Sequence, residues 1–419
     1  METIRVLMLP KWYPNRYDDL DGDFVERHIE AIAAHGSPEG GPVQAAAVYA
    51  SVAQRAMVTL IDEEIDHSGP VPTWRYYYRA RPTGLPGVDK LLKLLLWLEC
   101  LRRGRRAVRR FWGGKLPHVV HAHVLFRPAV LAWWLKWRYG IPYLITEHWT
   151  AFHPDSARRL GWLRRWLAGW LIRQAAAYTP VSDDLRRALA ALGGVNPCTV
   201  VIPNVVDTEL FRLPARPGER RGLLNVAAFN ERAKNLSGLL RTLARLRTAQ
   251  PDLPGLHLRV VGYGAAEQQL HRLAADLDLL ADGTVEFVGK QTSAQVASEM
   301  RRAACFVLFS NYENLPCVLI EAQASGLPAV ATRVNGVPEL LPDDGTAGLL
   351  VPPRDEAALG EAILAVLTAP LGRFDETALR ARAVERFSYP AVGRAFGRVY
   401  QQILGEPLNQ GRAHQPTSR

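Results

Sequence analysis

The sequence predicts an α/β protein with two domains in tandem, each built around a parallel β-sheet. The chain has 419 residues, which is enough for two domains that each bury a core of their own. Short apolar segments of strand length alternate along it with longer segments of helical pattern, as they do in strand–helix–strand units. A proline-containing segment at residues 207–221 interrupts this alternation, which then starts again, so we expect a linker between two similar halves.

The first half contains six short apolar segments that each predict a buried strand. They lie at residues 4–9, 43–50, 119–123, 143–146, 178–181 and 199–202. A helix is expected at residues 24–34, after the glycine-containing turn that ends at Asp23. Another is expected at residues 183–192, because the Ser182 hydroxyl can accept a hydrogen bond from the first turn and two glycines follow the last turn.

The second half repeats the pattern with six further strands. They are expected at residues 222–228, 256–261, 285–288, 305–308, 329–331 and 348–351. Helices are expected at residues 236–248 and 318–324, where apolar residues recur at helical spacing. The polar tail at residues 405–419 is expected to be disordered.

The charge balance favours anionic partners. The chain has 51 lysine and arginine residues against 41 aspartate and glutamate residues, a formal net charge of +10. Such a charge suits nucleic acid, a phospholipid surface or phosphorylated small molecules. The four cysteines are not spaced like metal ligands or a redox pair, which fits a reducing, cytoplasmic compartment. We expect no signal peptide, and no apolar run reaches the ~20 residues that a membrane span needs.

Two glutamates and the start of a helix form the most informative motif. Seven residues separate Glu313 from Glu321; Glu321 falls inside the helix expected at residues 318–324, and Glu313 lies in the loop before it. A helix N-terminus offers unpaired N–H groups and a partial positive charge, which suit a diphosphate. A loop carboxylate beside it could accept hydrogen bonds from sugar hydroxyls, and a carboxylate further along could bind the two hydroxyls of a ribose.

This Glu-x7-Glu pair, followed by a small-residue turn and a buried strand, resembles the hallmark of the family-4 glycosyltransferases of the GT-B fold. The resemblance covers nearly the whole chain and includes the glycine turn at residues 335–339 and the segment at residues 202–207. It implies two facing Rossmann-like domains, an acceptor domain at residues 1–206 and a nucleotide-sugar donor domain at residues 207–388. It also implies a final helix at residues 389–404 that crosses back to the first domain.

The resemblance further implies how the donor is bound. In the segment at residues 225–235, Lys234 matches a family lysine whose ammonium can neutralise charge on the departing nucleoside diphosphate. The arginine that is usual in this segment is missing, and Arg232 is the candidate to replace it. Glu313 is expected to orient the sugar and Glu321 to bind the ribose. The other donor-binding residues that we expect are Gly22, Gly262, Lys290, Asn314, Leu315, Cys317 and Val318.

No cofactor or metal ion is expected, because the resemblance assigns the electrostatic work to a lysine and a helix N-terminus. The sequence does contain an Asp-x-Asp triplet, formed by Asp21 and Asp23, which binds a metal in the other large glycosyltransferase fold. Here the triplet lies in an aspartate-rich turn before a helix, and matches this short often arise by chance. We therefore interpret it as a turn.

Histidines follow two predicted strands of the first half. His148 comes after the strand at residues 143–146, and doubly wound sheets bind ligands beyond the carboxyl ends of their strands. It matches the family's histidine that touches the transferred sugar, and Trp149 and His123 are expected on the acceptor side. His121 lies two residues before His123, so both point to the same face; a structural role is the better interpretation for His121.

Two basic stretches of the first half also contain leucine and tryptophan. They lie at residues 90–112 and 158–173, and Trp162, Trp166 and Trp170 recur at every fourth position of the second stretch. Basic helices with such residues on one face can lie in a lipid headgroup layer, so we expect peripheral contact with a membrane. The alternative is that these aromatic side chains belong to the core.

Together these features predict a retaining hexosyltransferase that uses a nucleotide-sugar donor and a glycan or lipid-linked acceptor. We expect a role in bacterial cell-surface polysaccharide or glycolipid synthesis, in the cytoplasm and on the inner face of the membrane. Two alternatives share this fold: a sugar-nucleotide 2-epimerase, and a non-catalytic relative that binds nucleotide sugars, which the missing arginine allows. A nucleic-acid-binding protein would also suit the charge, but we recognise no such module and expect no nucleic-acid partner.

Overall fold

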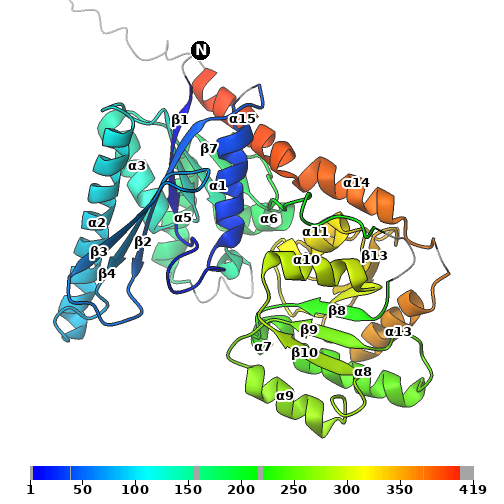
Figure 1. Cartoon of the computed structure of the whole chain (residues 1–419). Coiled ribbons are helices and arrows are strands. Elements are labelled where there is room, and N and C mark those ends of the chain that lie inside the picture. The colour runs from blue at the N-terminus through cyan, green and yellow to red at the C-terminus, as the bar shows by residue number, and fades with distance from the viewer. Residues whose placement is uncertain (1–2, 38, 154–159, 216–219, 371, 406–419) are drawn as a thin grey trace, which may run out of the picture.

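The computed structural model describes residues 3–37, 39–153, 160–215, 220–370 and 372–405. In this part of the chain two α/β domains each surround a central sheet, and a pair of helices at the C-terminal end spans from the second domain to the first (Figure 1). The predicted disordered tail lies, apart from its first residue, outside the described residues. The predicted α/β class and the restart of the pattern after the linker are confirmed.

The first sheet has seven strands in the order β3-β4-β2-β1-β5-β6-β7, all parallel to their neighbours except β3. The strands are β1 (Arg5–Pro10), β2 (Gln44–Val52), β3 (Ile61–Asp66), β4 (Thr73–Tyr78), β5 (Val119–His123), β6 (Tyr143–Glu147) and β7 (Ala177–Pro180). The helices are α1 (Asp23–His35), α2 (Pro86–Phe111), α3 (Arg127–Tyr139), α5 (Trp162–Gln174) and α6 (Asp183–Ala191), with a 3-10 turn at Thr150–Phe152. The strand order reverses between β1 and β5, where doubly wound sheets bind ligands.

The central strand β1 shows how this sheet is covered on both faces. Val6 and Met8 point into the cluster formed with α1 and the C-terminal helix, whereas Leu7 and Leu9 point into the cluster formed with α2, α3 and α5. All four side chains are buried, which explains why β1 is apolar at every position after Arg5 rather than at every second one. The alternation of a strand thus divides the first domain into two helical layers.

The second sheet has six strands in the order β10-β9-β8-β11-β12-β13, all parallel. The strands are β8 (Leu223–Val226), β9 (Leu258–Val261), β10 (Val285–Gly289), β11 (Cys305–Leu308), β12 (Ala329–Thr332) and β13 (Gly348–Val351). The helices are α7 (Glu231–Lys234), α8 (Leu236–Ala249), α9 (Glu267–Asp276), α10 (Ser293–Arg302), α11 (Cys317–Ala324), α12 (Val337–Leu340), α13 (Glu356–Leu367) and α14 (Glu376–Phe387).

The last helix, α15 (Tyr389–Gly405), packs against α1, so the predicted crossover to the first domain is confirmed (Figure 1). Gly393 allows the close approach, because a Cβ there would lie 2.3 Å from the Ala31 carbonyl oxygen. The chain passes between the domains a first time before β8 and a second time at the junction of α14 and α15. The two passages touch each other, since the Val206 N–H donates to the Phe387 carbonyl at 2.9 Å.

The strands β3 and β4 were not predicted, and one predicted strand is wrong. β3 is an edge strand that pairs antiparallel with β4, and four of its six residues are acidic, so it lacks the apolar run that predicts a buried strand. Residues 199–202 form only an isolated bridge, between Thr199 and Tyr178, although the N–H groups of Val200 and Ile202 still donate to carbonyls of β7, at 3.0 and 3.1 Å. The Ser182 cap is confirmed, since its hydroxyl accepts from the Leu185 N–H at 3.1 Å.

None of the helices in the described ranges combines the length and the apolar content that crossing a bilayer requires. The longest one, α2, carries arginine along much of its length and leaves several leucines exposed.

Candidate active site

Lys234 and Glu313 form an ion pair in the second domain. Lys234 ends the short helix α7 after β8, and Glu313 follows β11; these strands are adjacent and parallel, so the segments after them meet at one edge. The Lys234 Nζ lies 2.5 Å from the Glu313 Oε1, and the Ser310 hydroxyl donates to the same oxygen at 2.7 Å. The structure therefore brings together the two groups predicted to act on the leaving group and on the sugar.

Helix α11 begins immediately after the Glu313 loop. Pro316 occupies its N-cap position and supplies no capping side chain, which leaves the N–H groups of Cys317 and Val318 for an anion. Burial raises the pKa of the Cys317 thiol to about 12, so the thiol stays neutral and adds no negative charge. The helix start predicted to bind a diphosphate thus offers two amides and no opposing charge of its own.

Glu321 lies one turn further along α11 and binds a residue of the first domain. The Arg27 Nη1 on α1 is 2.8 Å from the Glu321 Oε1, and its Nη2 is 2.5 Å from the Asp23 Oδ2. Burial raises the pKa of Glu321, and the Arg27 charge opposes that rise. Arg27 was not predicted from the sequence. Its spacing of four from Asp23 on a helix is a local signal, but Glu321 is 294 positions away.

Asn314 and Leu315 connect the Glu313 loop to the first domain. The Asn314 Nδ2 donates to the His148 carbonyl at 2.9 Å, and its Oδ1 accepts from the Ser182 hydroxyl at 2.9 Å. The Asn204 Nδ2 donates to the Leu315 carbonyl at 2.7 Å. These buried contacts place His148 of the first domain next to the predicted donor loop of the second.

Glu339 makes a further contact between the domains. Its two carboxylate oxygens accept from the N–H groups of Asp183 and Asp184, both at 2.9 Å. These are the first two N–H groups of α6, where a helix has unpaired donors and favours negative charge. Glu339 ends the glycine turn predicted at residues 335–339, and its partner on α6 was not predicted.

The side chain of His148 lies in a buried cluster of imidazoles. Its Nδ1 is 3.3 Å from the Asn204 Oδ1, which can only accept, so His148 is protonated at Nδ1 and its Nε2 faces the His123 Nδ1 at 3.5 Å. His28 donates from its Nε2 to the Pro203 carbonyl at 2.9 Å, which leaves its Nδ1 as an acceptor without a partner. Burial lowers the pKa values of all three histidines, so the cluster is neutral.

This cluster is also the place where the described residues could hold a metal ion. Ring nitrogens of His28, His123 and His148 lie within 4.8 Å of one another. Neutral imidazoles suit Zn²⁺ and similar ions, and the carbonyl bonded to His28 fixes its tautomer as a partner of a metal ligand does. The expectation that the reaction needs no metal ion stays a prediction. The aspartates of the Asp-x-Asp triplet have other partners, since Asp23 pairs with Arg27 and Asp21 accepts from the Asn15 side chain.

Glu147 sets the position of His148 and Trp149. Its buried carboxylate accepts hydrogen bonds from the N–H groups of Leu125, His148 and Trp149 at 2.7 to 2.9 Å. Burial raises its pKa to about 7, against the effect of these donors. The Lys11 ammonium lies 3.6 Å from the centre of the Trp149 ring. Glu147 was not singled out from the sequence, although it directly precedes His148.

Arg232 and Lys290 are two further residues predicted to bind the donor. Arg232 is two residues before Lys234 on α7, and side chains two apart on a helix point in different directions. Lys290 lies 2.5 Å from Asp19 in the loop of the first domain and is 43% exposed. Contacts of Arg232 and Lys290 with a donor stay predictions.

Two predicted glycines occupy positions that only glycine fits. Gly22 is the N-cap of α1 with φ 73°, and a Cβ there would lie 2.4 Å from the Trp12 carbonyl carbon. Gly262 follows β9 with φ 147°, and a Cβ would lie 1.9 Å from the Ala227 carbonyl oxygen. Both glycines allow tight packing of loops beyond strand ends, which is a sufficient reason for their presence.

Comparisons with known proteins agree with this architecture. The model of the glycosyl transferase 4-like domain matches residues 25–205, and the model of the glycosyl transferases group 1 matches residues 220–369. The phosphatidyl-myo-inositol mannosyltransferase of Mycobacterium leprae is 31% identical over 300 residues, which are 68% of this chain and 73% of that protein. The glycogen synthase of Mycobacterium tuberculosis strain CDC 1551 is 29% identical over 316 residues, 72% of each chain.

Solved structures share the fold. The sucrose-phosphate synthase of Thermosynechococcus elongatus has a TM-score of 0.73 at 22% identity, covering 96% of this chain and 99% of that one. The HepE protein of Anabaena in complex with UDP has a TM-score of 0.67 at 16% identity, with 94% and 99% covered. The two facing parallel sheets define a glycosyltransferase of the GT-B fold. The chain belongs to the family-4 glycosyltransferases.

Proposed function

We propose that this glycosyltransferase moves a hexose from a nucleotide-sugar donor to a glycan or a lipid-linked acceptor, with retention of configuration at the anomeric carbon. The observation that carries the proposal is the Lys234–Glu313 ion pair beside the free amides of α11. A cation and a helix N-terminus next to each other match the two negative phosphates of a nucleoside diphosphate. The complex of the similar HepE protein with UDP supports a nucleotide-sugar donor.

Retention without an enzyme nucleophile fits the way the carboxylates are held. A double displacement needs a carboxylate free to attack the anomeric carbon. Glu313 is bonded to Lys234 and Ser310, and Glu321 is bonded to Arg27, so both are arranged as hydrogen-bond acceptors. We therefore propose a front-face transfer. The bond from the anomeric carbon to the diphosphate breaks, the acceptor oxygen bonds to that carbon on the same face, and the acceptor proton passes to a diphosphate oxygen.

The named residues divide this reaction between the domains. Lys234 and the amides of Cys317 and Val318 would stabilise the diphosphate as its charge grows. Glu313 would accept from the hydroxyls of the sugar. His148 would contact the transferred sugar from the first domain.

Arg27 is the residue we propose in place of the family's missing arginine. It lies next to Glu321 on the donor helix, and its guanidinium can hydrogen-bond two oxygens at once. If ribose hydroxyls bind to Glu321, one arm of Arg27 becomes available to a phosphate. This role fits the position better than Arg232, whose direction on α7 differs from that of Lys234.

The acceptor would enter from the first domain, past Trp149 and His123. The similarity to a phosphatidyl-myo-inositol mannosyltransferase supports a lipid-linked acceptor, and the similarity to a glycogen synthase supports a glycan. Either acceptor suits bacterial polysaccharide or glycolipid synthesis at the cytoplasmic face of a membrane. Exposed leucine and tryptophan side chains on α2, α3 and α5 support peripheral membrane contact; they include Leu91, Leu95, Trp137, Trp162 and Trp166.

The test of the reaction is product analysis. The purified chain is incubated with UDP- and GDP-hexoses, with and without a mixture of glycan and lipid acceptors, and the products are followed by mass spectrometry and by NMR of the anomeric proton. Transfer with the donor's anomeric configuration is expected. Inversion would contradict the front-face mechanism. Isomerisation of the donor sugar without an acceptor would identify a 2-epimerase, and binding without turnover would identify a non-catalytic relative.

A further inference from the structure

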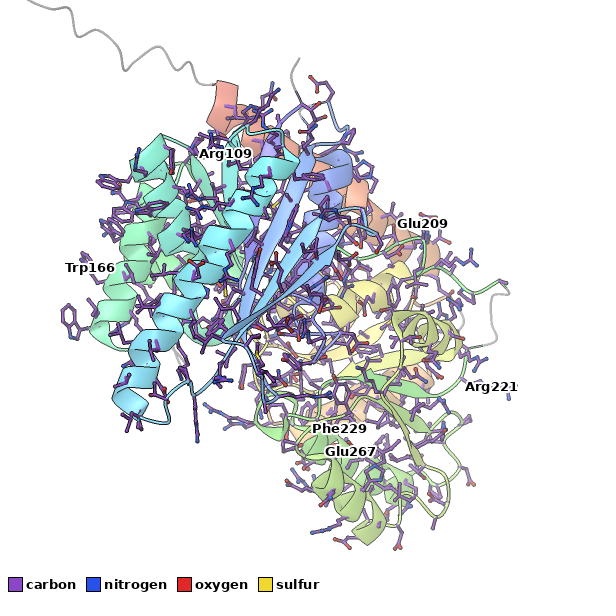
Figure 2. All side chains as sticks on the ribbon, turned by 60° about the vertical axis from the view of Figure 1, so that its left-hand side comes forward. Arg109, Trp166, Glu209, Arg221, Phe229 and Glu267 are labelled. Atoms are coloured by element: carbon purple, nitrogen blue, oxygen red, sulfur yellow. The ribbon has the colours of Figure 1, made fainter. Side chains whose placement is uncertain are left out.

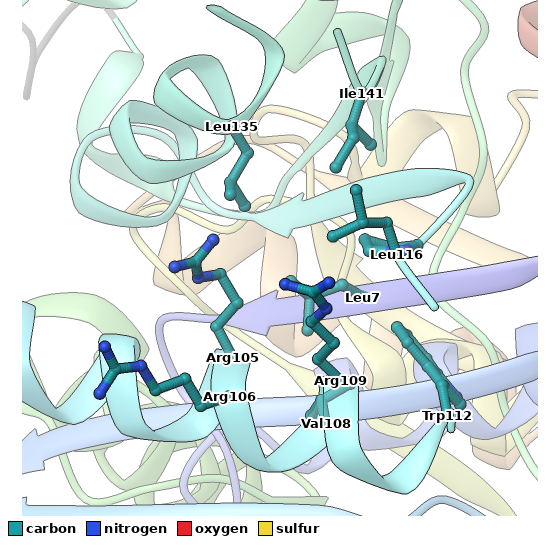
Figure 3. A pocket seen from close by; sticks show the side chains of 10 residues that line it. Leu7, Arg105, Arg106, Val108, Arg109, Trp112, Leu116, Leu135 and Ile141 are labelled. Carbon is teal, nitrogen blue, oxygen red and sulfur yellow. The ribbon is translucent and has the colours of Figure 1, made fainter. Parts of the chain in front are cut away.

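A cavity of about 220 Å³ lies in the first domain between α2 and α3 (Figure 3). Leu116 and Ile141, which precede β5 and β6, place it at the amino ends of the strands, whereas His148 lies beyond the carboxyl end of β6. The floor is apolar, since Val108 and Leu135 are buried and face it from the two helices. The cavity is therefore separate from the site that holds Lys234 and Glu313.

Three arginines of α2 line this cavity. They are Arg105, Arg106 and Arg109, and the Arg105 guanidinium extends from α2 in the direction of Leu135 on α3 (Figure 3). Arg105 donates to the Tyr139 hydroxyl at 2.9 Å, and Arg109 donates to a backbone carbonyl at 2.8 Å. Over the described ranges, none of the three has a carboxylate partner. Their charges are thus available to an anion.

An aromatic ring and aliphatic side chains complete the lining. The Trp112 ring lines the cavity with 7% of its surface exposed, together with Leu116 and Ile141. Arginines without a carboxylate partner and an apolar lining together describe a ligand with an anionic group attached to an apolar one.

We propose that this cavity binds an anionic phospholipid. Its phosphate would accept from Arg105 and Arg109, and the first carbons of an acyl chain would contact Leu116 and Val108. A lipid source fits the neighbouring surface, because Phe111 on α2 and Trp134 on α3 are exposed there, and the Arg105 guanidinium lies 5.7 Å from the centre of the Trp134 ring. Figure 2 shows Arg109 near one end of α2 and Trp166 on α5. The proposal specifies the partner in the membrane contact proposed above and rests on that contact.

Binding is tested on the full chain with soluble probes. Dihexanoyl phosphatidylglycerol, below its micelle-forming concentration, is titrated in a calorimeter, with dihexanoyl phosphatidylcholine and inorganic phosphate as separate arms. The cavity variant is R105Q/R109Q. The matched control is R103Q/R110Q, which removes the same charge from the same helix outside the cavity lining. A further variant, Leu116→Trp, fills the cavity and keeps its charge.

We expect saturable binding of the phosphatidylglycerol and an affinity about tenfold weaker in R105Q/R109Q and in Leu116→Trp, since each loses part of the site. The control should bind like the unmodified chain. Circular dichroism melts confirm that each variant is folded. An equal loss of affinity in the control and in the cavity variant would show that the effect comes from surface charge alone. Binding of inorganic phosphate as tight as that of phosphatidylglycerol would identify the cavity as a free-phosphate site. Either result would overturn the proposal, as would unchanged binding in Leu116→Trp.

Two further measurements separate this proposal from the catalytic one. Flotation with phosphatidylcholine vesicles, with and without phosphatidylglycerol, shows whether the cavity acts at a bilayer. Selective loss of binding to the anionic vesicles in R105Q/R109Q is expected, and equal binding of all variants to both vesicles would contradict it. Transfer to a soluble acceptor should be unaffected in this variant. A chain that binds the lipid but transfers no sugar would refute the proposed function and leave the cavity assignment intact.

Discussion

At the scale of single residues, Lys234 is the group whose removal should cost the most activity. Lys234→Ala is expected to lower kcat/KM by about 30- to 1000-fold, or ~2–4 kcal/mol, because a preorganised cation on the leaving group is lost. Initial rates with a nucleotide-sugar donor measure the effect. Arg232→Ala is the matched comparison on the same short helix and should cost much less, because its side chain points elsewhere. Equal losses in the two variants would contradict the assignment.

The buried histidines predict that acid destabilises the protein. Burial lowers the pKa of His28 to about 4 and also lowers those of His121, His123 and His148, whereas unfolded histidines titrate near pH ~6.5. Between these values the unfolded chain binds protons that the folded chain does not. The free energy of unfolding should therefore fall as the pH falls, by up to about 1.4 kcal/mol per pH unit for each histidine.

Glu147 acts in the opposite sense. Its pKa is raised to about 7, so from there down to about pH 4.5 the folded chain holds a proton that the unfolded chain lacks. Burial also raises the pKa values of Glu321 and of the partly buried Asp21, Glu26 and Glu30, which act in the same sense as Glu147. We expect the four buried histidines to outweigh these carboxyls, so that the net slope keeps its sign. Urea unfolding at several values from about pH 7 to pH 5 measures the slope, and His28→Gln should reduce it. A free energy of unfolding that rises in acid would refute this prediction.

The placement of site residues could be predicted where one chemical type recurs at a fixed spacing. Glu313 and Glu321 lie on a short segment with a helix start between them, so their chemistry follows from local sequence. The partners Arg27 and Glu339 could not be found in this way, because each meets its counterpart more than 150 positions away across the domain boundary. Only the packing of the two domains decides which charges become neighbours.

At the scale of elements, the contact of α15 with α1 gives a prediction of unusual sign. Replacing glycine by alanine inside a helix usually stabilises it by about 1 kcal/mol. Gly393→Ala should instead lower the free energy of unfolding, because the new Cβ would lie 2.3 Å from the Ala31 carbonyl. Gly360→Ala in α13 is the control, since its Cβ would make an ordinary contact at 3.6 Å and should stabilise. Thermal melts measure both, and a stabilised Gly393→Ala would show that the helices can separate freely.

Strands were predictable where burial on both faces requires consecutive apolar residues. β5 and β11 match their predicted ranges, since both are central strands buried on both faces. β3 was missed because an edge strand can be polar, and its carboxylates are instead satisfied by arginines such as Arg16 and Arg75. Residues 199–202 are an apolar segment that does run beside β7 and donates two hydrogen bonds to it, but the pairing amounts to one bridge and not to a strand.

At the scale of the whole molecule, Arg27 connects the state of the domains to ligand binding. Arg27→Ala is expected to weaken binding of UDP or GDP by about tenfold or more, because a charge-assisted hydrogen bond near the phosphates is lost. It should also raise the radius of gyration in X-ray scattering, since the bridge to Glu321 is removed. Asp23→Asn, which leaves that bridge in place, is the control. Unchanged affinity and radius in Arg27→Ala would contradict both roles.

The fold of the whole molecule was largely predictable because each half repeats a strand–helix alternation with few topological solutions. The relative placement of the halves was implied only by the resemblance. Contacts such as the one from Asn314 to the His148 carbonyl depend on loops whose conformation has no periodic pattern in the sequence.

The contact of Val206 with Phe387 limits how the two domains can move. A single linker would permit rotation about many axes, but here two segments of the chain cross the domain boundary next to each other. Motion that leaves both crossings intact is confined to swinging about the line that joins them. Donor entry and product exit would then follow one reproducible trajectory, and every opening would separate the same pair of surfaces.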